Sequence, residues 1–410
     1  MSQLGTREPA LSKTDTYRNS NATYTDERAL FSSVIWTDVL APFVATRCLL
    51  WLVGRISQVF PASLSYGSTP AAVRGWGVST HSWLDIWCRW DSGWYMQIAE
   101  QGYLPAPSYQ TVPSSMPFFP LFPMTVRALT LLLPAAARQP ETTAYIGVVF
   151  ANAAFVAGLY VLHKLIVYHF DRTAAQRAVL YVLTFPTAFF FSCFYPESLL
   201  LATTTWACWL ATRHNWLAAC LVAALAALSR PYGIVVSLPI AWFYMNARAW
   251  KPNAIRFDVL YLLLPLAALL AYFLAVKPQT GDLLGPLHAQ AAWQRHVSTP
   301  WHTFFSDPGT AGEISRVQQC MVPVVLGLSI YGFWRLPSKV YAIYALAMFV
   351  PTLCAGSLTS IGRHAALVFP IYMVLATLNL GERGHQALQV LGLTVQVLFM
   401  AMWARFYLIF

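Results

Sequence analysis

A carboxylate stands inside an aromatic-rich segment near the start of the chain. Asp91 lies in residues 89–103, which also contain Arg89, Trp90 and Trp94. If this segment is a helix, positions three and four apart share one face. The residues on the face of Asp91 are then Trp87, Trp94, Tyr95 and Ile98. An ionised carboxylate among apolar rings costs free energy unless it forms an ion pair or a hydrogen bond with a partner or a ligand. The segment therefore predicts that Asp91 takes part in chemistry, the alternative being a helix that lies on the membrane surface with its rings as anchors.

Charged side chains beside proline, glycine or aromatic residues form a second group of candidates. They are Glu197, Arg230, Arg295, Arg363 and His364, together with the aromatic Trp293 beside Arg295. Several have a structural alternative. Glu197 can form an ion pair with an arginine such as Arg230 and so close two helix ends, and an arginine at the end of a membrane span can reach out to the interface. A lone histidine such as His364 can simply satisfy the start of a helix. The sequence alone leaves these alternatives open.

No metal site is expected. Residues 277–316 contain His288, His296 and His302 with Asp282 and Asp307, but their spacing matches no standard ligand set. The seven cysteines form no Cys-x-x-Cys pair or His/Cys cluster, which argues against a zinc site or a disulfide framework. Aromatic platforms for a sugar or a prenyl chain are the better interpretation of this segment, and we expect no cofactor.

The composition is that of a protein embedded in a membrane. Of the 410 residues, 57% are hydrophobic and only 10% are charged, whereas soluble domains carry about 25% charged residues. The mean hydropathy is +0.52. Apolar runs of roughly 17–25 residues recur along the chain, as transmembrane helices require, and the short alternating segments of a membrane barrel are absent. The sequence predicts an all-α polytopic bundle of about eleven transmembrane helices.

The expected spans cover most of the chain after a polar tail at residues 1–33. They lie near residues 34–59, 143–168, 178–194, 197–212, 216–230, 232–247, 257–276, 317–335, 340–356, 364–380 and 386–409. Residues 117–136 are apolar but interrupted by prolines, and we expect a re-entrant or interfacial helix there. With that choice the loop clusters of Lys and Arg fall on the cytoplasmic side, together with the tail, as the positive-inside rule requires.

This topology gathers the polar motifs on one side of the membrane. Residues 34–410 form a single transmembrane domain in which two long loops, 61–142 and 277–316, are extracytoplasmic. Asp91 lies in the first of these loops, and the motifs around Glu197, Arg230 and Arg363 fall on the same side. Ionisable residues that meet at one edge of a membrane protein indicate a shared cavity.

The order and spacing of these motifs resemble the PIG-V family, the second mannosyltransferases of glycosylphosphatidylinositol (GPI) assembly, and above all its bacterial relatives. The matching stretches are residues 89–91, 98–103, 118–123, 195–199, 229–230, 281–295 and 362–370. No single stretch is specific, but together they extend over about residues 35–375.

The resemblance implies a glycosyltransferase of GT-C type. Such an enzyme would transfer a hexose, with mannose expected, from a polyprenyl-phosphate donor to a lipid-linked or extracytoplasmic glycan acceptor, with inversion. Asp91 would be the general base that takes the proton of the acceptor hydroxyl. Cationic side chains would stabilise the leaving phosphate, with Arg230, Arg363 and His364 as the candidates. The remaining expected substrate contacts are Arg89, Trp90, Trp94, Tyr95, Glu197, Trp293 and Arg295.

The expected partners are the lipid-linked donor, the acceptor and membrane lipids. Nucleic acid is not expected, because the net charge of +10 belongs to short loops between spans. The sequence is silent on a partner subunit. We expect a bacterial cytoplasmic membrane with the active site on the extracytoplasmic face. One alternative is a true GPI mannosyltransferase that adds the second mannose in the endoplasmic reticulum. The other is a lipid or sugar transporter, which the lack of an internal repeat disfavours.

Overall fold

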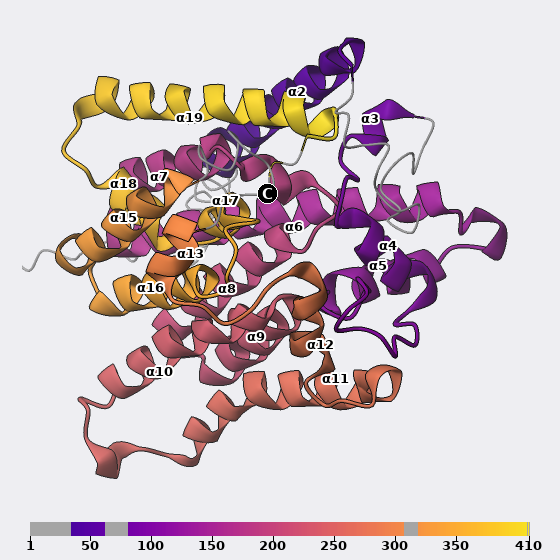
Figure 1. Ribbon diagram of the computed structural model, residues 1–410. Coiled ribbons are helices and arrows are strands. Elements are labelled where there is room, and N and C mark those ends of the chain that lie inside the picture. The colour runs from indigo at the N-terminus through magenta and orange to yellow at the C-terminus, as the bar shows by residue number, and fades with distance from the viewer. Residues whose placement is uncertain (1–33, 62–80, 307–318, 408, 410) are drawn as a thin grey trace, which may run out of the picture.

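The computed structural model describes residues 34–61, 81–306, 319–407 and 409. The tail at 1–33, part of the first loop (62–80) and residues 307–318, with Asp307, lie outside the described residues. Within the described ranges every regular element is helical, which agrees with the all-α prediction (Figure 1).

Four helical stretches are long and apolar enough to cross a membrane. They are Trp36–Val59, Pro140–His169 (α6), Phe257–Thr280 and Gly381–Ala404 (α19). The first joins η1 (Trp36–Leu40), α2 (Ala41–Ile56) and η2 (Ser57–Val59), and the third joins η8 (Phe257–Leu263) and α11 (Leu264–Thr280). At 24 to 30 residues each, they exceed the roughly 20 residues that a spanning helix needs. The chain is therefore an integral membrane protein, and the expected count of eleven spans is not confirmed.

Several other helices that fall on predicted spans are 10 to 16 residues long, and one of them has the predicted bounds, 197–212. They are α7 (Arg172–Thr184), α8 (Glu197–Thr212), α9 (Trp216–Ser229), α10 (Ser237–Asn246), α15 (Met321–Arg335) and α16 (Lys339–Leu353). Two predicted spans are wrong in their bounds because prolines interrupt them. The 178–194 span ends at Thr184, since Phe185 precedes a proline and adopts an extended backbone. The 364–380 span is divided into α17 (Ile361–Ala366) and α18 (Pro370–Ala376).

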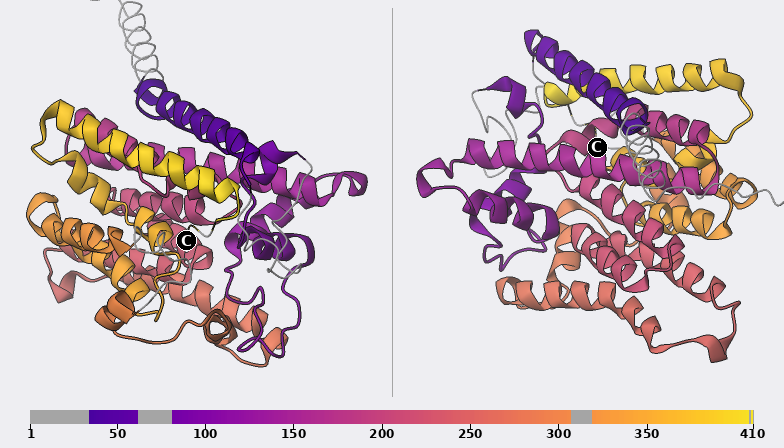
Figure 2. Two further views of the ribbon diagram at one scale, coloured as in Figure 1. Left: turned by 45° about the horizontal axis from the view of Figure 1, so that its top comes forward. Right: turned by 180° about the vertical axis from the view of Figure 1, so that it is seen from behind.

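Small residues let the central helices approach closely. A Cβ added to Gly158 of α6 would lie 3.1 Å from the backbone of Ala202 in α8. Such contacts between small residues are typical of helix packing in membranes. The hairpin of α8 and α9 then brings Glu197, at the start of α8, to the same end as Arg230, which directly follows α9 (Figures 1 and 2).

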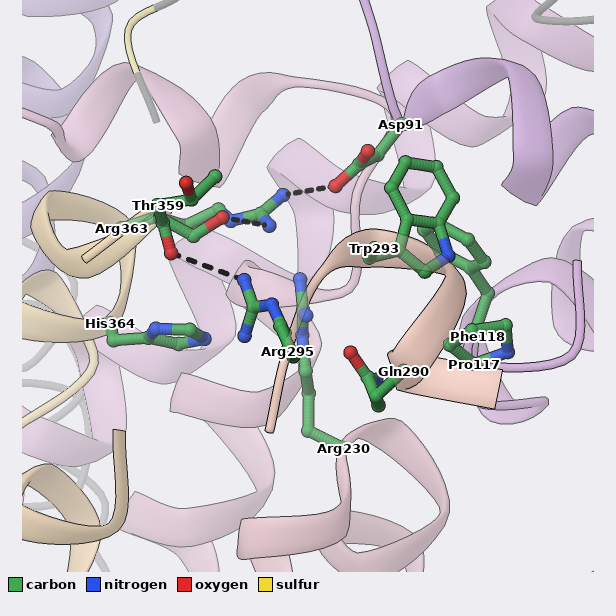
Figure 3. A pocket seen from close by; sticks show the side chains of 11 residues that line it. Asp91, Pro117, Phe118, Arg230, Gln290, Trp293, Arg295, Thr359, Arg363 and His364 are labelled. Atoms are coloured by element: carbon green, nitrogen blue, oxygen red, sulfur yellow. Dashed lines mark hydrogen bonds and ion pairs between the residues drawn. The ribbon is translucent and has the colours of Figure 1, made fainter. Parts of the chain in front are cut away.

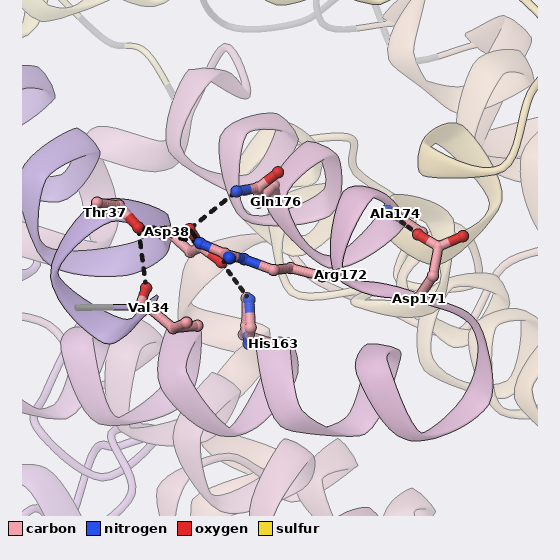
Figure 4. A network of polar contacts seen from close by, with 8 residues as sticks. All are labelled: Val34, Thr37, Asp38, His163, Asp171, Arg172, Ala174 and Gln176. Atoms are coloured by element: carbon pink, nitrogen blue, oxygen red, sulfur yellow. Dashed lines mark hydrogen bonds and ion pairs between the residues drawn. The ribbon is translucent and has the colours of Figure 1, made fainter. Parts of the chain in front are cut away.

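A buried carboxylate fixes the first helix against its neighbours. Asp38 accepts hydrogen bonds from Arg172 Nε (2.7 Å), Arg172 Nη2 (2.9 Å) and Gln176 Nε2 (2.8 Å), and its Oδ2 lies 3.1 Å from His163 Nε2 (Figure 4). Its partners come from α6 and α7, so one side chain ties three helices together. With every acceptor position in use, this network is structural.

The two long loops meet at one end of the bundle. The short elements of these loops are α3 (Ser82–Asp85), α4 (Ser92–Gln101), α5 (Leu121–Leu131), η4 (Ala135–Ala137), α12 (Gly285–His288), η9 (Ala289–Trp293) and α13 (Pro300–Ser306). Helices α4 and α5 pack together beside one end of α6 (Figures 1 and 2). The backbone N–H of Ala106 in the first loop donates to Gln279 O at the end of α11, 2.9 Å away. With 11 residues, α5 is about 16 Å long and too short to cross the membrane.

The predicted helical face around Asp91 is wrong in one respect. Helix α4 begins at Ser92, and Trp90, just before it, has a positive φ of 53°, so the helical backbone conformation does not continue back to residue 87. Trp87 therefore lies in a preceding turn and shares no helix with Asp91, whereas Trp94 and Tyr95 lie in the first turns of α4. The backbone carbonyl of Asp91 accepts from the N–H groups of both.

Candidate active site

Asp91 opens onto a polar pocket of about 110 Å³ between the loops and the bundle. The residues that line it are Asp91, Pro117, Phe118, Arg230, Gln290, Trp293, Arg295, Thr359, Ser360, Arg363 and His364 (Figure 3). They come from segments far apart in the sequence: the first loop, the turn after α9, the second loop and the start of α17. The pocket is therefore a product of tertiary folding.

Hydrogen bonds on the side away from the pocket fix the turn that carries Asp91. Tyr195 donates its hydroxyl hydrogen to Arg89 O at 2.9 Å, and Trp403 Nε1 donates to Ile86 O at 2.9 Å. Arg89 itself is buried, forms an ion pair with Asp85 and lies 3.9 Å from the ring centroid of Phe406. These contacts fix the backbone on which Asp91 is mounted.

Arg363 connects the two acidic side chains of the site. Its Nη1 lies 3.0 Å from Asp91 Oδ2, and its Nε lies 3.4 Å from Glu197 Oε1. Its third nitrogen, Nη2, donates to Ser360 Oγ at 2.9 Å. Asp91 Oδ1 makes no hydrogen bond within the part of the chain that the structure describes. One carboxylate oxygen is thus anchored and the other is available to a substrate.

Glu197 lies behind the pocket wall between two arginines. It is 1% exposed, and in addition to Arg363 it forms an ion pair with Arg230. This ion pair is the structural alternative that the sequence left open for Glu197. A buried carboxylate between two guanidinium groups is compensated in charge, and it keeps both arginines oriented.

Arg295 is the pocket arginine without a carboxylate partner among the described residues. Its Nη2 donates to Thr359 O at 3.1 Å, and burial lowers the pKa of its guanidinium to about 10, so it stays charged at neutral pH. The second loop holds it in place, since the N–H of the neighbouring His296 donates to Ala355 O at 3.2 Å.

The charges of the site do not balance. The guanidinium groups of Arg230, Arg295 and Arg363 face the carboxylates of Asp91 and Glu197. With a neutral His364, these five groups carry one excess positive charge. A pocket with an excess cation and buried donors favours an anionic ligand such as a phosphate.

Aromatic rings form the opposite wall. Trp293 lies edge-on to Trp94 and to Phe118, with both centroid separations at 5.8 Å, and Trp94 stacks on Phe118 at 6.0 Å. The rings come from η9, α4 and the segment before α5. They join the two loops and present an apolar surface opposite the charged one.

Sequence comparison identifies the family of the chain. The profile of the family described as Mannosyltransferase (PIG-V) matches residues 48–280, which is more than half of the chain. The chain belongs to the PIG-V mannosyltransferase family. Membership in a family of mannosyltransferases argues against the transporter alternative. The match includes Asp91, Glu197 and Arg230, whereas Arg295 and Arg363 lie beyond it.

Two further comparisons add little. No curated protein sequence matches the chain. Among solved structures, the Archaeoglobus fulgidus oligosaccharyltransferase in complex with zinc and sulfate is similar over 88% of this chain, with 13% identity and a TM-score of 0.42. The similarity covers 53% of that chain, so this PIG-V family member spans about half of its length.

Several predicted site residues of this PIG-V family member meet in the pocket. They are Asp91, Arg230, Trp293, Arg295, Arg363 and His364. Trp94 and Glu197 stand directly behind the wall, Tyr95 is buried among rings, and Arg89 and Trp90 do not line the pocket. Arg89, Trp94, Tyr95 and Glu197 therefore support the pocket from behind.

Five other lining residues were not among the predicted site residues. They are Pro117, Phe118, Gln290, Thr359 and Ser360. Phe118 belongs to a motif of the family resemblance, so a signal for it existed. Thr359 and Ser360 are uncharged and precede the Gly-Arg-His motif, and Ser360 adopts a positive φ of 73° at the start of α17. Nothing in their residue types points to a site.

The described residues contain no group of three His, Cys, Asp or Glu side chains arranged to hold a metal ion. The pocket lining itself contains one carboxylate and one imidazole, and its remaining charged groups are arginines. Its polar groups can bind an anion and accept a proton, which are the two tasks of a transfer from a phosphate-linked sugar.

Proposed function

We propose that this PIG-V family member is a GT-C-type enzyme that transfers a hexose, with mannose expected, from a polyprenyl-phosphate donor to a lipid-linked or extracytoplasmic glycan acceptor. The observation that carries the proposal is the pairing of Asp91 with an excess of guanidinium groups in one pocket. A proton acceptor beside an anion site is what displacement of a phosphate-linked sugar requires.

The reaction is a single inverting displacement. The acceptor hydroxyl oxygen attacks the anomeric carbon as its proton passes to Asp91, through the oxygen Oδ1 that Arg363 leaves uncontacted. The bond between the anomeric carbon and the phosphate oxygen breaks, and its electron pair leaves with the polyprenyl phosphate. The donor is itself a lipid, so the chain needs no nucleotide-binding domain, and in this proposal arginines stabilise the leaving phosphate.

The arginines have different tasks in this proposal. Arg363 is occupied by Asp91 and Glu197 and acts as a positioning residue for the base. Arg295 has no carboxylate partner among the described residues, so we assign the donor phosphate first to Arg295, with Arg230 and His364 beside it. This assignment moves the main phosphate contact from the residues expected from sequence to one in the second loop.

An assay of the donor class tests this function. The purified full-length chain in lipid nanodiscs is expected to transfer mannose from a synthetic polyprenyl-phosphate mannose and to be inactive with a nucleotide-linked mannose. In the Arg295→Gln variant, loss of a charge-assisted hydrogen bond of about 1.5–3 kcal/mol is expected to raise the KM for the lipid donor roughly 10- to 100-fold.

Arg138→Gln is the matched control. Arg138 is an exposed arginine of the first loop, remote from the pocket lining, and its bonds are to the carbonyls of Leu131 and Leu133. Its replacement is expected to leave the donor KM within twofold of the wild type. An unchanged donor KM in Arg295→Gln would contradict the phosphate assignment, and use of the nucleotide-linked sugar would contradict the donor class.

We also propose a bacterial cytoplasmic membrane with the pocket on its outer face, the alternative being the lumenal face of the endoplasmic reticulum. In a variant without its native cysteines, a single cysteine at Gln139 is expected to react with a membrane-impermeant maleimide on intact cells, because Gln139 is exposed at the end of the first loop. A cysteine at Lys251, an exposed position on the expected cytoplasmic side, should react only after permeabilisation. The reverse pattern would contradict the orientation.

The choice between a bacterial enzyme and a GPI mannosyltransferase rests on the acceptor. Restoration of GPI assembly in cells that lack the second mannosyltransferase would favour the endoplasmic reticulum alternative. We favour the bacterial one because residues 281–295 and 362–370 look more like that branch of the family.

A further inference from the structure

A second, outer pocket adjoins the candidate active site. It has a volume of about 360 Å³ and is lined by Gln110, Leu287, His288, Ala291 and Arg295. Arg295 lines both pockets, and the short segment formed by α12 and η9 separates them. Gln290 and Trp293 of this segment line the inner pocket, whereas Leu287, His288 and Ala291 line the outer one.

The sizes of the two pockets indicate different ligands. The inner pocket, at about 110 Å³, is below the roughly 300–1,000 Å³ of typical small-molecule sites. It can hold a phosphate and the reacting atoms, but two complete substrates do not fit. The outer pocket, a recess of about 360 Å³ that is largely open to solvent, has room for a sugar ring and shares a wall residue with the inner one.

The polar wall of the outer pocket is organised by one carboxylate. Asp282 Oδ2 lies 2.6 Å from His288 Nδ1 and accepts a hydrogen bond of 2.8 Å from the Tyr109 hydroxyl. Gln110 Nε2 in turn donates to the Tyr109 oxygen at 2.9 Å. The hydrogen bonds from His288 and Tyr109 also lower the pKa of Asp282 and keep it ionised. With Nδ1 bound to Asp282, the other ring nitrogen of His288 is left for a ligand.

This chemistry suits a neutral polyol better than an anion. The amide of Gln110 and the imidazole of His288 can each donate to and accept from hydroxyl groups, and the guanidinium of Arg295 can donate to them, while Leu287 and Ala291 supply an apolar floor. The nearby Asp282 carboxylate repels a second anionic group. A sugar ring, with hydroxyls at its rim and C–H groups on its faces, matches both parts of the wall.

We propose that the outer pocket binds the sugar headgroup of the acceptor, with Gln110, His288 and Arg295 as its polar contacts. This inference rests on the proposed transferase function, because only a transferase needs a second substrate beside the donor phosphate. Arg295 then stands between the two substrates and brings the acceptor hydroxyl toward the inner pocket.

Photolabelling of the full-length chain in nanodiscs tests the site without depending on turnover. The probe is octyl α-mannoside with a diazirine on its sugar. It is expected to label residues 104–116 and 285–296, and competition with unlabelled octyl α-mannoside or with methyl α-mannoside shows whether the lipid chain contributes. Displacement by both supports recognition of the sugar itself. Labelling confined to other segments overturns the proposal, as does displacement by the octyl compound alone.

Kinetic variants provide the second measurement. Gln110→Ala and His288→Gln are each expected to raise the KM for octyl α-mannoside roughly tenfold while the KM for the polyprenyl-phosphate donor stays within twofold. Gln139→Ala, an exposed amide of the same loop outside both pockets, is the control. Unchanged acceptor KM values in both variants overturn the site.

The two measurements separate this inference from the proposed function. Labelling of the outer pocket in a wild-type chain that transfers no mannose would support the sugar site and overturn the transferase proposal. Normal mannose transfer by both outer-pocket variants would support the transferase proposal and overturn the sugar site.

Discussion

Replacement of Asp91 with asparagine is expected to lower the rate constant of sugar transfer by roughly 10²–10⁴-fold, the contribution of a positioned general base. Asparagine has nearly the same shape but cannot take up the proton of the acceptor hydroxyl. The measurement is steady-state transfer from polyprenyl-phosphate mannose by the full-length chain in nanodiscs, with kcat and both KM values determined separately.

The donor KM distinguishes a lost base from a damaged pocket. Asp91→Asn removes one of the two carboxylates that face three arginines, so the excess positive charge grows and the donor phosphate should bind at least as tightly. A fall in kcat with an unchanged or lower donor KM is therefore expected. A collapsed site would raise the donor KM as well.

Asp171→Asn is the control for this substitution. Asp171 caps the N-terminus of α7 by accepting from the N–H of Ala174 at 2.7 Å, far from the pocket lining. Asparagine is about as good a cap as aspartate, so both activity and stability should persist. A wild-type kcat in Asp91→Asn would remove Asp91 from the mechanism.

Much of the site could be predicted because its charges are rare in their surroundings. In a chain with 10% charged residues, Asp91, Arg230 and Arg363 stand out beside apolar spans. Charge counting across the loops predicts that they lie on one side of the membrane, and the structure brings them to one pocket. Composition and apolar run length likewise led to an all-α membrane protein, since only helices and closed barrels satisfy the backbone in lipid.

The rest depended on contacts between distant segments. The partners of Arg363 lie 272 residues away at Asp91 and 166 residues away at Glu197, and one sequence carries no record of such pairs. Arg89 was expected to bind substrate, but its neighbour Asp85 is its partner in the structure. Local spacing also gave Asp91 a helical face with Trp87, which the positive φ of Trp90 prevents.

Loss of Arg363 is expected to destabilise the protein as well as to inactivate it. Arg363 is 3% exposed and contacts both Asp91 and Glu197, and removal of one partner of a buried pair typically costs about 3–5 kcal/mol. Because Glu197 keeps Arg230 and the Asp91 side chain is 16% exposed, we expect Arg363→Met near the lower end of that range. The measurement is the apparent unfolding temperature in nanodiscs, followed by tryptophan fluorescence.

A double-mutant cycle with Glu197→Gln shows whether this cost arises from the ion pair. When Glu197 is already replaced by neutral glutamine, Arg363→Met removes the ion-pair partner of Asp91 alone. The loss of stability that Arg363→Met causes should then be smaller by about 0.5–3 kcal/mol than in the wild type. Glu382→Gln provides the matched cycle, because Glu382 pairs with Arg177 on the surface and is remote from Arg363. The stability changes caused by Glu382→Gln and by Arg363→Met should be additive within about 0.5 kcal/mol. Equal coupling in the two cycles would contradict a special link between Arg363 and Glu197.

Arg363→Lys then separates stability from the positioning of the base. Lysine keeps the positive charge between the two carboxylates, so most of the lost stability should return. Its single ammonium group cannot present two nitrogens in a fixed fork, as Arg363 does when Nη1 contacts Asp91 and Nε contacts Glu197. We therefore expect a folded protein with a kcat reduced roughly tenfold or more, since a misplaced base transfers protons poorly. Wild-type kcat in a stable Arg363→Lys would mean that charge alone, and not the fork of Arg363, orients Asp91.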